Sequence, residues 1–122
     1  MEQSILKSTK KLAGLSEDNT VFDLEILTDI NAAFSSLSQV GIGNGAPIED
    51  DRAQWSSLEL PVEQLNLVKT YISDKVRLAF DPPGTSFLIQ ILKDRIQEQE
   101  WRLNVFAEAD RVISEVEEEV DV

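Results

Sequence analysis

The sequence predicts an all-α protein, a small bundle of about four helices with a long loop and an acidic C-terminal segment. Apolar residues recur at three- and four-residue steps in separate stretches, the period of a helix with one buried face. Gly14, Gly41 and the pair Pro82–Pro83 fall between those stretches, where they end helices. At 122 residues the chain is long enough for one domain with a modest core. We expect a helical domain over residues 1–107 and a separate acidic segment over 108–122.

The most regular helix follows the double proline. Pro82–Pro83 ends the preceding helix, Gly84 loosens the turn, and Thr85 or Ser86 can cap the helix that follows. The apolar positions of this helix form one stripe: Leu88, Ile91, Leu92, Ile96, Gln99, Leu103 and Phe106. The two helices on either side of the prolines should therefore form a hairpin.

The first two helices are expected over residues 4–13 and 21–40. Gly14 is the predicted C-cap of the first, whose basic residues are interpreted as solvated. For the second we expect a capping box with Asp23 as its acidic member, and an end at Gly41. The solvated lysines are Lys7, Lys10 and Lys11; the cap of the second helix is Asn19 or Thr20; its buried stripe is Leu27, Ile30, Phe34 and Leu37.

The third helix is expected from about Pro61 to Phe80. Its apolar residues cover more than one face, which is typical of a helix at the centre of a bundle or shared with another subunit. Around the hairpin, the predicted core residues are Val76, Leu78, Phe80, Phe87 and Leu103.

Residues 41–60 form the longest irregular section. Its GIGNG string lacks the Lys-Ser/Thr of a phosphate-binding loop, and no strand precedes it, so no nucleotide site is predicted. The Glu49–Asp51 cluster matches no calcium-binding loop and is interpreted as a solvated acidic surface. Ile48 and Trp55 are apolar within this polar section. The loop should therefore fold back onto the core or touch a neighbouring chain.

Composition argues against several classes of function. The chain has no cysteine and no histidine, which removes thiolate metal sites and the usual general base near neutral pH. We therefore expect no enzyme activity, no cofactor and no metal. The net charge of −12 disfavours binding of nucleic acid through its phosphates. No apolar run approaches the roughly 20 residues of a membrane span, and the N-terminal residues lack the apolar core of a signal peptide.

Negative charge gathers at the C-terminal end. Residues 108–122 carry seven acidic residues and one arginine, a net charge of −6 and half of the total. The segment also keeps helical spacing of apolar residues, among them Val112, Ile113 and Val116. Two interpretations remain open: a segment that is frayed alone and becomes helical on a partner, or a solubilising acidic tail.

Several stretches, taken in order, resemble a known family. They are Asp29–Gly41 (DINAAFSSLSQVG), Ile48–Asp51 (IEDD) with Trp55 after it, Val68–Pro83 (VKTYISDKVRLAFDPP), Thr85–Ile89 (TSFLI) and Glu100–Asn104 (EWRLN). In this order and spacing they resemble the head–tail connector, or adaptor, family of long-tailed double-stranded DNA bacteriophages. The resemblance covers roughly residues 4–107 and does not extend with equal strength into the acidic segment.

The resemblance implies a structural protein of the virion neck, assembled in the host cytoplasm. Such proteins form a homo-oligomeric ring, usually of about twelve copies, between the portal and a stopper or tail-completion protein. DNA passes through the ring without specific binding, and a negatively charged channel would repel its phosphates. Carried onto this sequence, the portal-facing candidates are Val112, Ile113 and Val116. The stopper-facing or inter-subunit candidates are Ile48, Asp50, Arg52 and Trp55, with Arg77 and Arg102 as further inter-subunit candidates.

Two alternatives are kept beside the adaptor. One is another neck component, a stopper or tail-completion protein, although a mostly β pattern would be expected there. The other is an acidic helical protein-binding module, such as a regulator or DNA mimic, which would be a stable monomer or dimer.

Overall fold

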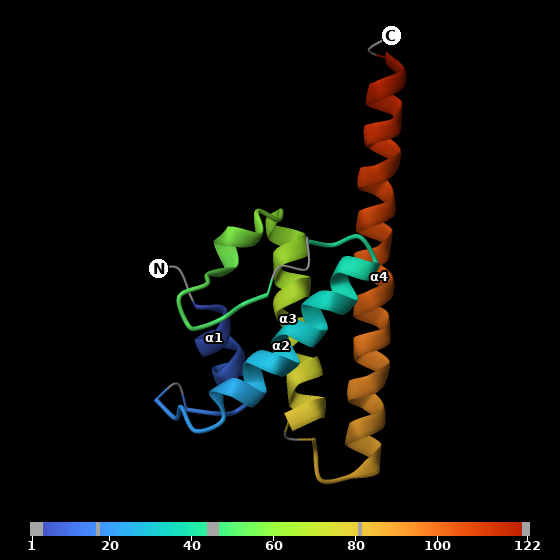
Figure 1. The fold of residues 1–122 in the computed structure, drawn as a ribbon. Helices are drawn as coiled ribbons and strands as arrows, with labels where there is room; N and C mark the ends of the chain where they lie inside the picture. Colours follow the sequence, from blue (N-terminus) through green and yellow to red (C-terminus); the bar gives the residue numbers. More distant parts are fainter. Residues whose placement is uncertain (1–3, 17, 44–46, 81, 121–122) are drawn as a thin grey trace.

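The computed structural model describes residues 4–16, 18–43, 47–80 and 82–120, with side chains described as far as residue 109. The helices are α1 (Ile5–Leu12), α2 (Asp23–Gln39), α3 (Val62–Phe80) and α4 (Ser86–Val120), and a short 3-10 helix, η1, spans Trp55–Leu58. Over those ranges strand pairing is limited to one isolated bridge between Ser4 and Gln54. The predicted all-α bundle is confirmed (Figure 1).

α3 occupies the centre of the bundle and contacts α1, α2 and α4. Its buried face carries Val68, Tyr71, Ile72 and Val76, none of which is exposed. Because three helices surround α3, its apolar residues are needed on more than one side. This confirms one of the two explanations that the sequence offered for the width of its apolar arc.

α4 is a single long helix, 35 residues in length and about 50 Å long at 1.5 Å per residue. It continues without a break from the predicted hairpin helix into the acidic segment, and its C-terminal part extends past the other helices (Figure 1). Across the part of the chain that the structure describes, no helix is both long and apolar enough to cross a membrane.

The predicted stripe of α4 is only partly buried. Leu92, Ile96, Gln99 and Leu103 are buried as expected, while Leu88 and Ile91 are exposed. The prediction that Phe87 belongs to the core is wrong, since its exposed fraction is 73%. α4 packs mainly against α3, and a single neighbouring helix covers only one side of it. The remaining apolar side chains of its first turns therefore face outward.

Left-handed glycines end the first two helices, as predicted. Gly14 has a φ of +88°, and the amide of Leu15 donates to the carbonyl of Lys10 at 2.8 Å. Gly41 has a φ of +95°, and the amide of Ile42 donates to the carbonyl of Leu37 at 2.9 Å. These bonds satisfy carbonyls that the helix itself leaves open.

The N-termini of the helices agree only in part with the predicted caps. The hydroxyl of Thr85 accepts from the amide of Leu88 at 3.3 Å, which confirms one of the two predicted caps of α4. The predicted cap of α2 is wrong: Phe22 occupies the cap position and makes no side-chain hydrogen bond there. Asn19 instead accepts from the amide of Val21 within the preceding turn. The expected acidic member of the capping box, Asp23, turns toward α1.

Candidate interaction surfaces

The loop between α2 and α3 is held against α1 by specific bonds. The indole Nε1 of Trp55 donates to the hydroxyl of Ser8 at 2.6 Å, in a buried contact. The amide of Ile5 donates to the carbonyl of Ala53 at 2.9 Å. The ammonium of Lys69 lies 5.8 Å from the centre of the Trp55 ring, within the range of a cation–π contact. Trp55 thus joins the loop, α1 and α3.

Asn31 fixes the other end of the same loop. Its amide nitrogen donates to the carbonyl of Ile48 at 3.0 Å, and its carbonyl oxygen accepts from the amide of Ile48 at 2.7 Å. The Asn31 side chain therefore makes the two backbone hydrogen bonds that a neighbouring β-strand would otherwise provide to Ile48. Nothing in the sequence pattern distinguished Asn31 from other polar residues of α2, because its partner lies 17 positions away.

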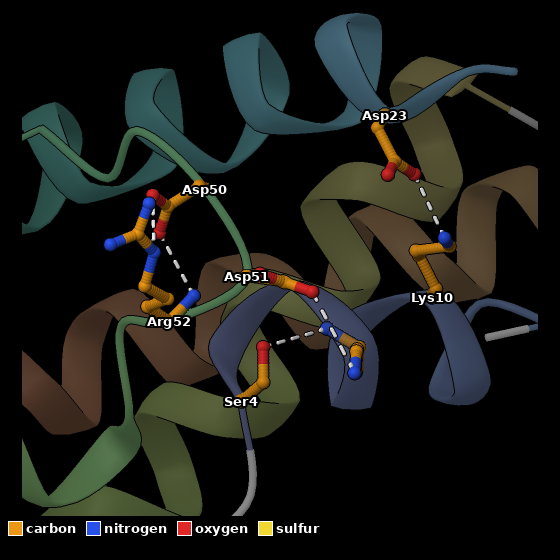
Figure 2. A network of polar contacts seen from close by, with 7 residues as sticks. Ser4, Lys10, Asp23, Asp50, Asp51 and Arg52 are labelled. Carbon is orange, nitrogen blue, oxygen red and sulfur yellow. Dashed lines mark hydrogen bonds and ion pairs between the residues drawn. The ribbon is translucent and has the colours of Figure 1, made fainter. Parts of the chain in front are cut away.

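An ion pair joins α1 to the start of α2. The Nζ atom of Lys10 lies 2.8 Å from Oδ1 of Asp23, and the lysine is only 1% exposed (Figure 2). The interpretation of Lys10 as a solvated lysine is therefore wrong, since its helix face turns toward α2. Lys7 and Lys11 are exposed, as expected.

The loop candidates divide into buried and exposed side chains. Ile48 and Trp55 lie within the core cluster of the protomer, so contacts to another protein from this loop would fall to its polar residues. Asp50 accepts from the backbone amide of Arg52 at 2.9 Å and pairs with the Arg52 guanidinium at 3.2 Å. Asp51 lies 3.6 Å from Nζ of Lys7 on α1 (Figure 2).

A buried carboxylate joins α3 to α4. Asp74 accepts two bonds from the guanidinium of Arg95, at 2.7 and 2.6 Å, and a third from the amide of Gln99 at 3.1 Å. Its side chain is 8% exposed, while that of Arg95 is 50% exposed. Hydrogen bonding to Asp74 raises the pKa of Arg95, although burial opposes the shift. The contact sets the position of α4 along α3.

A second polar contact lies nearby on the same interface. The hydroxyl of Tyr71 donates to a carboxylate oxygen of Glu100 at 2.8 Å. Burial, followed by the bond to Glu100, raises the pKa of Tyr71. The hydroxyl therefore keeps its proton at alkaline pH values where a free tyrosine ionises. The sequence did not identify Asp74 or Tyr71 as hydrogen-bonding groups, because their partners Arg95 and Glu100 lie 21 and 29 positions away.

The outer side of the α3–α4 pair carries an apolar groove of about 500 Å³. Leu67 of α3 and Trp101, Val105 and Phe106 of α4 line it, with polar side chains among its walls. Trp101 is 67% exposed. Arg102, an inter-subunit candidate, also lines the groove and pairs with Glu98 one turn earlier at 3.5 Å.

The remaining candidates are placed as follows. Arg77 is exposed on α3. The side chains of Val112, Ile113 and Val116 lie outside the described residues, although the backbone there continues α4. Among the side chains that the structure describes, no group of three or more acidic residues is arranged to hold a metal ion.

Comparison with known proteins gives a family match. The family model described as phage connector protein matches residues 5–110 of the chain. No curated protein and no solved structure matches. The matched range covers α1, α2, α3 and most of α4.

Proposed function

Because this chain belongs to the phage connector protein family, we propose that it is the head–tail adaptor, a ring of identical copies between the portal and the stopper or tail-completion protein. A structural role in the phage neck, in association with other head–tail components, follows from the family itself. The proposal adds the position in the neck, the ring and its continuation of the DNA channel.

The observation that carries the proposal is the apolar outer surface of α4. The inner side of this helix is buried against the protomer, yet Phe87, Ile91, Trp101 and Val105 remain exposed on it. Apolar residues gathered on one exposed helix face, with a groove beside them, are typical of a surface that another protein covers. A ring adaptor needs such a surface on every copy.

Charge supports the proposed passage of DNA. The net charge is −12, so a ring of many copies would carry a large negative charge around its channel. Phosphates are repelled by carboxylates that lie within roughly one Debye length, about 8 Å at physiological salt. DNA could then move through the ring without adhering to its wall.

The two ends of the proposed ring are assigned to different segments. We propose that the C-terminal part of α4 contacts the portal through Val112, Ile113 and Val116, because this part of the helix extends past the rest of the domain (Figure 1). The loop that presents Asp50 and Arg52 is proposed to face the stopper or a neighbouring copy. Arg77 and Arg102 remain candidates for pairing with carboxylates between subunits.

Deletion of the gene from the phage tests the position in the neck. Heads that contain DNA but lack tails, or that lose their DNA, are expected by electron microscopy, because the portal would have nothing on which to seat the next component. Normal tailed virions from the deletion strain would refute the proposal. A particle reconstruction that places the chain distal to the portal-bound ring would instead favour the stopper or tail-completion alternative.

Removal of residues 108–122 tests the portal contact. The truncated chain keeps α1, α2, α3 and all but the last three residues of the matched range, so its helicity per residue should be preserved while its affinity for purified portal falls. Replacement of Val112, Ile113 and Val116 by serine in the full-length chain is the matched variant, because it preserves charge and length. Unchanged portal affinity in both variants would refute this assignment.

A further inference from the structure

The outward side of α4 carries an ordered pattern of apolar and acidic residues. Its exposed positions follow one another at steps of four, three, four, three and four, which places them on a single face. They are Phe87, Ile91, Asp94, Glu98, Trp101 and Val105, all exposed, and are called here the outer stripe. Two apolar residues lie at each end of the stripe and two acids at its centre. A helix or surface that covers it needs basic groups one turn apart, flanked by apolar ones.

The chain itself presents basic groups with this spacing on α1. Lys7 and Lys11 are both exposed and lie one turn apart, the spacing that separates Asp94 from Glu98. Leu12, the last residue of α1, is also exposed. The exposed Val21 follows α1 in the loop that leads to α2. We call Lys7, Lys11, Leu12 and Val21 the α1 surface.

The two surfaces belong to opposite sides of the protomer. In Figure 1, α1 and α4 lie at opposite edges of the domain, with α2 and α3 between them. The α1 surface therefore cannot cover the outer stripe of its own chain, but it can cover that of a second copy. A contact between two different surfaces of the same chain repeats from copy to copy, and it closes into a ring when the rotation permits.

We propose that the outer stripe of each copy binds the α1 surface of the next, with Lys7 and Lys11 opposite Asp94 and Glu98. This inference rests on the proposed ring, and it names the surfaces that form it. Contact between two outer stripes is disfavoured, because each acidic pair would then face another acidic pair. Leu12, which follows Lys11 in the chain, would approach the apolar residues at one end of the stripe.

Existing contacts of these charges do not block the pairing. Lys7 lies 3.6 Å from Asp51, and Glu98 lies 3.5 Å from Arg102, with every one of these side chains half exposed or more. Solvent-exposed pairs of this kind contribute little stability. Their exchange for contacts between copies therefore costs little, and the lysines can turn to the neighbouring α4.

Paired cysteines test the contact directly. The chain contains no cysteine, so Lys11→Cys together with Asp94→Cys places one thiol on each of the two surfaces, and the single-cysteine variants reveal any disulfide between like positions. Oxidation of this double variant, in solution and in assembled particles, should give a ladder of dimers and higher oligomers on a denaturing gel. Each single-cysteine variant should stay monomeric on the gel, because a dimer would show that like positions of two copies meet. The matched control keeps Lys11→Cys and moves the second cysteine to Lys93, an exposed neighbour on another face of α4.

Charge reversal tests the same contact without a covalent link. Lys7→Glu with Lys11→Glu, and separately Asp94→Lys with Glu98→Lys, should each weaken self-association roughly tenfold or more, because like charges then face each other. An equal mixture of the two variants should recover it, since each variant presents the complement of the other. Circular dichroism confirms that these exposed substitutions leave the helices intact.

The outcomes distinguish failure of the proposed contact surfaces from failure of the proposed ring. A ladder and recovery in the mixture support the inference. Failure of both, in particles that nevertheless contain a connector ring, overturns the inference and leaves the ring adaptor standing. If the α1 variant associates normally while the α4 variant does not, the outer stripe binds a different protein, and the inference is again overturned. Particles without any oligomer of this chain would refute the ring itself.

Discussion

Replacement of Arg95 by alanine should destabilise the domain more than its half-exposed position suggests. Asp74 is 8% exposed and accepts two bonds from this guanidinium. Without Arg95, the carboxylate stays buried with only the Gln99 amide as a described partner. Loss of one member of a buried pair typically costs 3–5 kcal/mol. We expect about 3 kcal/mol here, at the lower end, because one side of the pair reaches water.

The measurement is urea unfolding followed by far-UV circular dichroism, at a dilute and fixed protein concentration so that self-association does not contribute. For a domain of this size, 3 kcal/mol corresponds to a fall in Tm of roughly 12 °C. The matched control is Arg102→Ala, which removes an exposed pair one turn apart on the same helix and should cost less than about 0.5 kcal/mol.

A double-mutant cycle tests whether the loss of stability arises from the unpaired carboxylate of Asp74. Asp74→Ala combined with Arg95→Ala removes the buried charge along with its partner, so the double variant should be less destabilised than the sum of the single variants. Equal stability losses for Arg95→Ala and Arg102→Ala would contradict this reasoning. Strict additivity of the two single variants would contradict it as well.

Three further perturbations test the glycine, the loop anchor and the tyrosine. Gly41→Ala should lower the free energy of unfolding by about 1–2 kcal/mol. The backbone φ there is +95°, and the new Cβ would lie 3.0 Å from the Cβ of Ala107. The control in the same urea assay is Gly43→Ala, where φ is also positive but no atom lies within 4 Å of the new Cβ. Asn31→Ala removes both bonds to Ile48 and should cost about 2 kcal/mol, with faster proteolysis within residues 41–60; unchanged cleavage would contradict the anchoring role. The pKa of Tyr71 is raised in the folded protein, so the folded state retains a proton that the unfolded chain loses near pH 10. Stability should therefore fall as the pH rises above 10, and the single tyrosine should ionise only on unfolding, as seen by its near-ultraviolet absorbance; ionisation of the native protein at pH 10 would contradict this.

The helices and their ends could be predicted because their causes are local. Gly14 and Gly41 end helices through a backbone conformation that glycine adopts at low cost, and Pro82–Pro83 interrupts a helix wherever it stands. The period of apolar residues identified the buried side of α2. The predicted cap of α2 failed because the helix begins at Asp23, later than expected, and Asn19 accepts from Val21 in the turn before it.

The interaction surfaces were harder to predict. Phe87 and Ile91 have the residue type and spacing of a core, and only the placement of a single helix beside α4 left them exposed. Ile48 and Trp55 were recognised as unusual for a loop, and the structure places both inside the protomer. The outer stripe was not found, because its two acids interrupt the apolar pattern.

Local features of the sequence were enough to predict a helical bundle, the positions of its main helices and the family that it resembles. Those properties depend on local torsions, on periodicity and on the order of short motifs. Tertiary structure decided which apolar residues are covered and which charges meet. Lys10 is buried, Asp74 is hydrogen-bonded to Arg95, 21 positions later in the chain, and α1 and α4 lie on opposite sides of the domain. Each of these depends on the packing of helices distant in the chain, and residue spacing alone does not fix that packing.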